Sequence, residues 1–98
     1  MSANADSEDA TITAQNTGTG WLTLNAGEAC SVSVSGLTGT SSTIFLQRRF
    51  PGITSLDVTS FTVNTEGSYV ADERTDVRLF CKTGGYSSDT IVLHLGKG

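Results

Sequence analysis

TIFLQRRF, residues 43–50, is the densest block of strand-forming side chains in this chain of 98 residues. Successive side chains of a strand point to opposite faces of its sheet, so Ile44 and Leu46 fall on one face and Phe45 and Gln47 on the other. Two later stretches have the same pattern, DVRLFCKT at residues 76–83 and DTIVLHLG at residues 89–96. We predict that all three are strands of one sheet.

The most regular alternation lies in residues 29–35, where Cys30, Val32 and Val34 alternate with serines. This pattern predicts a half-buried strand with one face in solvent. Shorter candidate strands lie at residues 11–14, 21–24, 55–58, 60–63 and 68–71. No stretch has the 3.6-residue apolar period of a helix. The sequence therefore predicts an all-β fold, a single antiparallel β-sandwich of about seven strands with immunoglobulin-like or related Greek-key order.

The length is that of one domain, which can bury a single core without metal or disulfide staples. Residues 1–10 are small, polar and acidic, a composition that predicts a flexible N-terminal arm. The β-sandwich domain then comprises residues 11–98.

The formal charge is −4, which argues against binding nucleic acid through a general basic surface. The first residues have neither the basic nor the apolar region of a secretory signal, and no apolar run is long enough to span a membrane. We expect a soluble protein made in the cytoplasm that binds neither nucleic acid nor membrane.

Few residues are candidates for chemistry. The single histidine, His94, lies in a strand pattern and is interpreted as a solvent-facing residue rather than a catalytic base. Asp72, Glu73 and Asp76 lack the glycine and the spacing of a calcium loop and are interpreted as a solvated turn. The sequence also has no phosphate-binding loop, zinc spacing or paired-carboxylate signature. We therefore predict no enzyme activity, no metal and no cofactor.

Cys30 and Cys81 have a spacing at which an immunoglobulin-type sandwich forms a disulfide across its core. The accompanying marks are missing, because Leu79 stands where that pattern has Tyr. In a reducing cytoplasm, two buried free thiols are the favoured interpretation.

Several of these stretches, taken in order, resemble a family of small tailed-bacteriophage proteins found among virion structural genes. The resemblance lies in VSGLTGT (34–40), TIFLQRRF (43–50), LDV (56–58), SFT (60–62), VRL (77–79) and GYSSDT (85–90). The family pattern has a Leu-Gln-Arg-Ser-Phe strand, an Asp-Gly-Gly turn and a Trp-x-Asp-Val strand. This chain departs from it at Arg49 in place of Ser, at residues 50–52 in place of the turn, and at Leu56 in place of Trp.

The resemblance implies a non-enzymatic component of the phage particle, made in the host cytoplasm and located in the virion. The favoured role is a capsid decoration (cement) protein that binds the outside of the head shell in multiple copies. Its partner would be the major capsid protein or another virion protein, and it would form a homo-oligomer. The alternatives are a neck, tail or fibre component of the virion, and a carbohydrate- or receptor-binding module.

A candidate interface follows if the three strands of the opening paragraph are neighbours in an immunoglobulin-like order. Their outward side chains form a face with two phenylalanines and three of the six basic residues, a composition typical of contact sites. The candidate residues are Phe45, Gln47, Arg49, Arg78, Phe80, Lys82, Val92 and His94. The alternative is that Phe45 and Phe80 form a cross-strand pair or lie under the N-terminal arm.

Overall fold

The computed structural model describes residues 7–37, 42–50, 54–87 and 89–97, and within these ranges the chain forms nine β-strands and no helix. The strands are β1 (Ser7–Ile12), β2 (Thr17–Gly18), β3 (Leu22–Leu24), β4 (Ala29–Ser35), β5 (Ile44–Arg49), β6 (Leu56–Phe61), β7 (Thr65–Val70), β8 (Thr75–Cys81) and β9 (Ile91–Lys97). The described part therefore offers no long apolar helix that could cross a membrane. The predicted all-β fold is confirmed.

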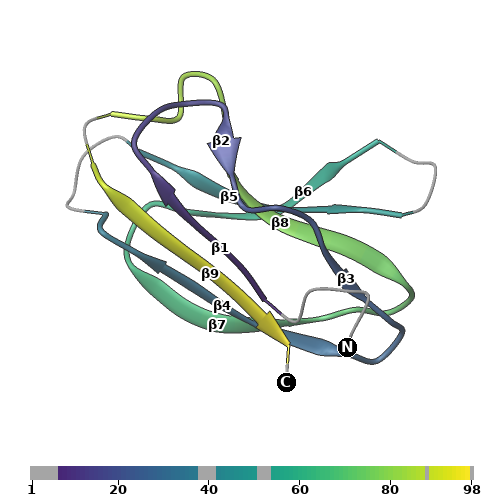
Figure 1. Cartoon of the computed structure of the whole chain (residues 1–98). Helices are drawn as coiled ribbons and strands as arrows, with labels where there is room; N and C mark the ends of the chain where they lie inside the picture. The colour runs from purple at the N-terminus through teal and green to yellow at the C-terminus, as the bar shows by residue number, and fades with distance from the viewer. Residues whose placement is uncertain (1–6, 38–41, 51–53, 88, 98) are drawn as a thin grey trace.

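Two antiparallel sheets form the two layers of the molecule (Figure 1). One sheet has the order β1-β9-β4-β7. In the other, β8 lies between β5 and the short strands β2 and β3, and β6 lies beyond β5. The strands β2 and β3 pair with successive parts of β8 and so act as one interrupted edge strand. This arrangement is consistent with a β-sandwich.

The strands pair in a nested order, in which the first half of the chain pairs with the second half in reverse. β1 pairs with β9, β2 and β3 with β8, β4 with β7, and β5 with β6. Two further pairings, β4 with β9 and β5 with β8, join these strand pairs into two sheets. An immunoglobulin-like order would place the last strand beside β8. The prediction that residues 89–96 share a sheet with β5 is therefore wrong, because β9 pairs with β1 and β4.

One core lies between the two sheets, and alternate residues of the long strands enter it. The buried side chains of β5, β8 and β9 are Ile44, Leu46, Val77, Leu79, Cys81, Ile91, Leu93 and Leu95. All eight belong to the inward register that the alternation predicts. The predicted strand over residues 29–35 is confirmed with the same bounds, and its Val32 and Val34 are buried.

The N-terminal boundary differs from the prediction. The flexible arm was placed at residues 1–10, whereas β1 begins at Ser7 and pairs along its whole length with β9. Ile12 at its end is 1% exposed. Residues 1–6 lie outside the described residues. Small polar residues suit this edge strand because only one of its faces contacts the core.

Residues 64–67, Asn-Thr-Glu-Gly, have the composition of a turn, yet the chain is extended from Thr65 onward. Thr65 begins β7, and Glu66 and Gly67 lie opposite Ser33 and Val32 of β4. A Thr-Glu-Gly sequence suits a turn locally, but the ladder to β4 holds it extended. Tertiary pairing overrides the local preference here.

The two cysteines are buried and free. Cys30 is near the start of β4, at the end of the sandwich where Leu24 of β3 pairs with Thr75 of β8. Cys81 is the last residue of β8, so about 20 Å of strand separates it from Thr75. A disulfide requires Cα atoms within about 7 Å. The predicted free thiols are confirmed.

We expect both thiols to react slowly in the folded protein, because burial raises the pKa of Cys30 and of Cys81 and so lowers their thiolate fraction at neutral pH. Titration with a thiol reagent should find two reactive groups per chain in denaturant without reductant. Native protein should react far more slowly. Fast reaction of either thiol in native protein would contradict this burial.

Candidate functional site

The outer face of the sheet that contains β5 and β8 gathers aromatic rings and cations. The register places Phe45 opposite Phe80 and Gln47 opposite Arg78. Trp21 directly precedes β3, whose Leu22 pairs with Val77 of β8. We call this surface the aromatic-cationic face. It is formed by Trp21, Phe45, Arg49, Arg78, Phe80 and Lys82.

Each aromatic ring of this face contacts a cation of the same chain. The Cζ atoms of Arg49 and Arg78 lie 4.2 and 4.4 Å from the ring centroid of Trp21. Arg78 also lies 4.1 Å from the centroid of Phe80, and the Lys82 Nζ lies 4.3 Å from that of Phe45. Each such contact contributes about 0.5–1 kcal/mol at an exposed site. Together they hold long side chains in fixed positions along the sheet.

The buried amide of Gln47 connects the charges of this face. Gln47 is 5% exposed, and its Oε1 accepts a 2.8 Å hydrogen bond from Arg78 Nε. Its Nε2 donates a 3.0 Å bond to Asp57 Oδ1 of β6. Asp57 also forms an ion pair with Lys82. The acceptor of the amide thus faces a cation and its donor faces an anion, which is the only orientation that satisfies both neighbours.

Two carboxylates, those of Asp57 and Asp76, accept hydrogen bonds from side chains of this face. The hydrogen bond from Lys82 lowers the pKa of Asp57 most, and the hydrogen bond from Gln47 lowers it further. Asp76 accepts a 3.1 Å bond from Arg49 Nε and a 2.8 Å bond from Thr23 Oγ1. Three cations and two carboxylates therefore lie together, in a chain with six basic and ten acidic residues. The predicted interface residues include no acidic side chain, but Asp57 reaches the face from β6 and Asp76 is an outward residue of β8.

Phe80 packs over a glycine that no other residue can replace without rearrangement. A Cβ atom at Gly18 would lie 2.8 Å from Phe80 Cδ1 and 2.3 Å from the carbonyl oxygen of Leu79. The close approach of β2 to β8 therefore requires glycine.

The structure brings six of the eight predicted interface residues together and separates two. Val92 and His94 project from β9, which lies in the other sheet, so they are on the opposite side of the molecule. The reason is the pairing of β9 with β4. His94 is exposed, as predicted, and its Nδ1 contacts Asp9 of β1. Trp21 is not among the predicted interface residues, although its position one residue before the alternating Leu22 and Leu24 places its side chain on the outward side of the sheet.

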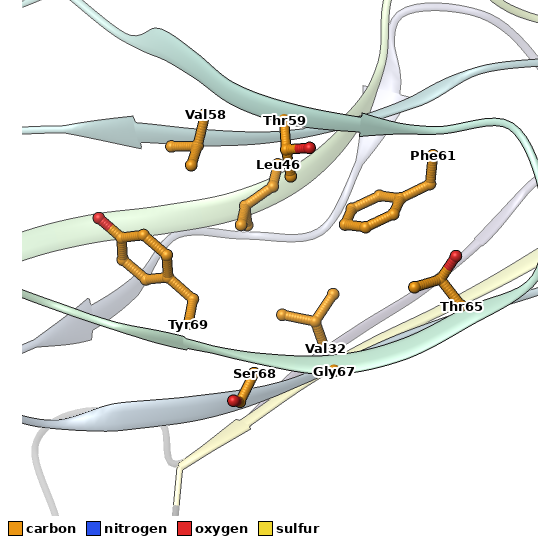
Figure 2. A pocket seen from close by; sticks show the side chains of 9 residues that line it. All are labelled: Val32, Leu46, Val58, Thr59, Phe61, Thr65, Gly67, Ser68 and Tyr69. Carbon is orange, nitrogen blue, oxygen red and sulfur yellow. The ribbon is translucent and has the colours of Figure 1, made fainter.

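A second feature is a cleft between the two sheets, where the edge strands β6 and β7 face each other (Figure 2). Its volume is about 270 Å³. The lining residues are Val32, Leu46, Val58, Thr59, Phe61, Thr65, Gly67, Ser68 and Tyr69. The cleft is mainly apolar and has no titratable side chain besides the tyrosine.

Clusters that could hold a metal ion are absent from the described ranges. Asp72 and Glu73 are exposed in the turn between β7 and β8, whereas Asp76 is engaged by Arg49 in β8. The interpretation as a solvated turn therefore fits Asp72 and Glu73 but is wrong for Asp76, which belongs to β8.

No protein-family model matches this chain, and neither does any curated protein or solved structure. Its function is therefore inferred from its residues and their arrangement.

Proposed function

We propose that this chain is a structural protein of a tailed-bacteriophage virion, a capsid decoration protein that binds the outside of the head shell in multiple copies. The observation that carries the proposal is the aromatic-cationic face, which gathers half of the basic residues of an acidic chain on one face of a sheet. The sequence resemblance, which covers about residues 21–96, is the second support. The partner is the major capsid protein or another virion protein, and the copies form a homo-oligomer.

The fold agrees with this role without assigning it. We infer that the nested pairing of β1 to β9 is a jelly roll, the related Greek-key alternative to the immunoglobulin-like order. Jelly rolls occur in viral capsid proteins and in lectins, so the fold is compatible with more than one function.

The aromatic-cationic face is suited to docking because its side chains are already ordered. Arginine and aromatic residues are enriched at interface centres. Here the side chains of Arg49, Arg78 and Lys82 are held by rings and carboxylates of the same chain. Binding therefore costs less side-chain entropy than it would for free cations. An acidic or apolar patch on the shell is the complementary surface.

Sugar binding is less well supported. A carbohydrate module needs aromatic rings that are open for stacking. In this chain the rings of Trp21, Phe45 and Phe80 each have a cation within 4.4 Å of the centroid. At least one face of each ring is therefore occupied. A neck, tail or fibre role uses the same kind of docking face, and copy number per particle distinguishes it: a shell protein numbers in the hundreds.

The test is the substitution Phe80→Ser. We expect it to weaken particle binding at least tenfold, because truncating a central aromatic residue of an interface costs about 2 kcal/mol or more. Co-sedimentation of purified protein with undecorated particles measures the binding, and circular dichroism monitors folding of the isolated domain. Lys82→Ala is the second variant, since it leaves the contact of Phe80 with Gly18 intact.

The matched control is Val92→Ser, which alters an exposed apolar residue of the opposite sheet. It should bind particles like the unmodified protein. Equal binding by all three variants, each folded, would show that the aromatic-cationic face is not the docking surface. Absence of the protein from purified virions would overturn the proposed function itself.

A further inference from the structure

The two long sides of the sandwich are not equivalent. On one side β1 and the interrupted strand of β2 and β3 close the sheets together: the Glu8 carboxylate lies so near Gly20 that a Cβ there would be 2.6 Å from it. On the other side β6 pairs only with β5, and β7 only with β4, among the described strands. The cleft lies between these two edges, so the core is open on this side (Figure 2).

The open side exposes apolar surface that continues into the core. Val32 and Leu46 of the core form part of the cleft wall, and Phe61 and Tyr69 enter it from opposite sheets (Figure 2). The described part of the chain has five large exposed hydrophobic residues, and four of them lie in β6, in β7 or in the turn between these strands. These four are Leu56, Val58, Val63 and Val70. Of these four, Val58 lines the cleft itself, and an exposed apolar residue on the wall of an apolar cleft is typical of an interaction site.

The two edges have only part of the usual protection against strand pairing. Natural edge strands are protected by lysine, proline, inward-pointing charges or bulges. The sequences LDVTSF of β6 and TEGSYV of β7 contain neither lysine nor proline. The only irregularity of β6 is the bulge that leaves Val58 without a partner on β5. Gly67 of β7 has no side chain, and no atom lies within 4 Å of the place where a Cβ would be.

The position of the cleft between two strand edges suits the side chains of an extended segment. Its volume is about 270 Å³, and residues of both β6 and β7 line it. In an extended strand, alternate side chains are about 6.8 Å apart and point the same way. A strand laid along β6 can therefore insert successive apolar side chains over Leu46 and Val32.

Beside the cleft, Arg48 contacts the lining residue Tyr69 and forms no ion pair with a carboxylate among the described residues. Arg48 continues the inward register of Ile44 and Leu46 and lies opposite Leu56 of β6. Its described contacts are a 3.4 Å hydrogen bond from Nη1 to the Tyr69 hydroxyl and the ring of Phe50, 5.0 Å from Cζ to the centroid. Arg49 and Lys82, by contrast, are each paired with an aspartate.

The position of Arg48 gives the bound strand a polarity. β6 runs from Leu56 to Phe61, so a strand antiparallel to it ends beside Leu56 and therefore beside Arg48. Antiparallel pairs are the more common and slightly the more stable. A carboxylate at the C-terminal end of such a strand supplies the anion that Arg48 lacks.

We propose that the cleft between β6 and β7 binds an extended segment of a partner polypeptide, which pairs antiparallel with β6, places apolar side chains at alternate positions in the cleft, and sets a carboxylate beside Arg48. This is strand addition to a sheet edge. The site is separate from the aromatic-cationic face and does not depend on the proposed function.

The test uses the synthetic peptide KTVTVTV with a free C-terminal carboxylate. We expect saturable binding to the full chain, with NMR shifts and slowed amide exchange confined to β6, β7 and the cleft residues. The same peptide with a C-terminal amide should bind about tenfold more weakly, because it loses a charge-assisted hydrogen bond. Arg48→Gln should reduce the affinity for the carboxylate peptide to that for the amide. Val58→Lys should abolish binding of both by placing a charge at the edge.

Arg74→Gln, which removes an exposed arginine from the turn between β7 and β8, is the matched control and should leave the affinity unchanged. Equal affinity for the two peptides, or shifts on β1 and β9 instead of β6, would overturn the proposal. So would self-association through this edge, seen as a doubled mass in sedimentation that Val58→Lys abolishes, because the occupant would then be a second copy of the chain. None of these outcomes bears on particle binding by the aromatic-cationic face.

Discussion

Replacing Gly36 with alanine is expected to lower the free energy of unfolding by about 3 kcal/mol or more. Gly36 follows β4 and has a φ of +90°, and a Cβ there would lie 2.1 Å from the carbonyl oxygen of Thr90. Both the backbone conformation and the contact exclude a side chain. Because Thr90 directly precedes β9, relief of the clash requires β4 and β9 to separate. Urea unfolding of the purified variant measures the loss.

Gly27→Ala is the matched control, since Gly27 has a similar φ of +83° but no atom within 4 Å of the added Cβ. Its cost should be about 1–2 kcal/mol, the cost of the left-handed conformation alone. The difference between the two variants then measures the clash with Thr90. Equal costs would mean that β9 does not lie against the end of β4 as described.

Removing β1 is expected to have a still larger effect. A variant that lacks residues 2–12 loses the ladder between β1 and β9 and the burial of Ile12, which is 1% exposed. Loss of a buried isoleucine side chain alone costs about 2–5 kcal/mol. For a domain of this size that corresponds to a fall in melting temperature of about 15 °C or to complete unfolding. Thermal denaturation followed by circular dichroism provides the measurement.

The control variant lacks only residues 2–6, which are small and polar, and it should melt within a few degrees of the full chain. This pair of deletions tests whether residues 7–12 belong to the fold, as the pairing of β1 with β9 indicates, or to a flexible arm over residues 1–10. If both deletions leave the melting temperature unchanged, β1 contributes nothing to the fold, and the edge of β9 must be stable without a neighbour.

Much of the core could be predicted because strand periodicity is local. An alternation of period two in residues 29–35, 43–50 and 76–83 is enough to tell inward from outward positions, since the backbone itself turns successive side chains to opposite faces. The buried positions of Val34, Leu46 and Leu79 follow from it. The same periodicity placed Phe45 and Phe80 on the outer surface, which is why most of the aromatic-cationic face could be found without coordinates.

Edge strands gave weaker signals. Leu56 and Val58 are apolar yet exposed by 54% and 39%, because β6 has a neighbour on one side only and its bulge shifts the register. Composition alone treats such residues as candidates for the core. The cleft that they border could not be predicted either, since it is a gap between two sheets rather than a pattern along one strand.

By itself, the sequence determined that the chain is all-β, which faces of its long strands are buried, and that its two cysteines belong to the core. Only the tertiary structure decided which strands are neighbours. The pairing of β9 with β4 puts Val92 and His94 on the side opposite Phe80, while Trp21 and Asp57 join Phe80 from strands on either side. The physical reason is that alternation is a property of a single backbone, whereas pairing depends on contacts between residues far apart in the chain, for which no local pattern of side chains provides a signal.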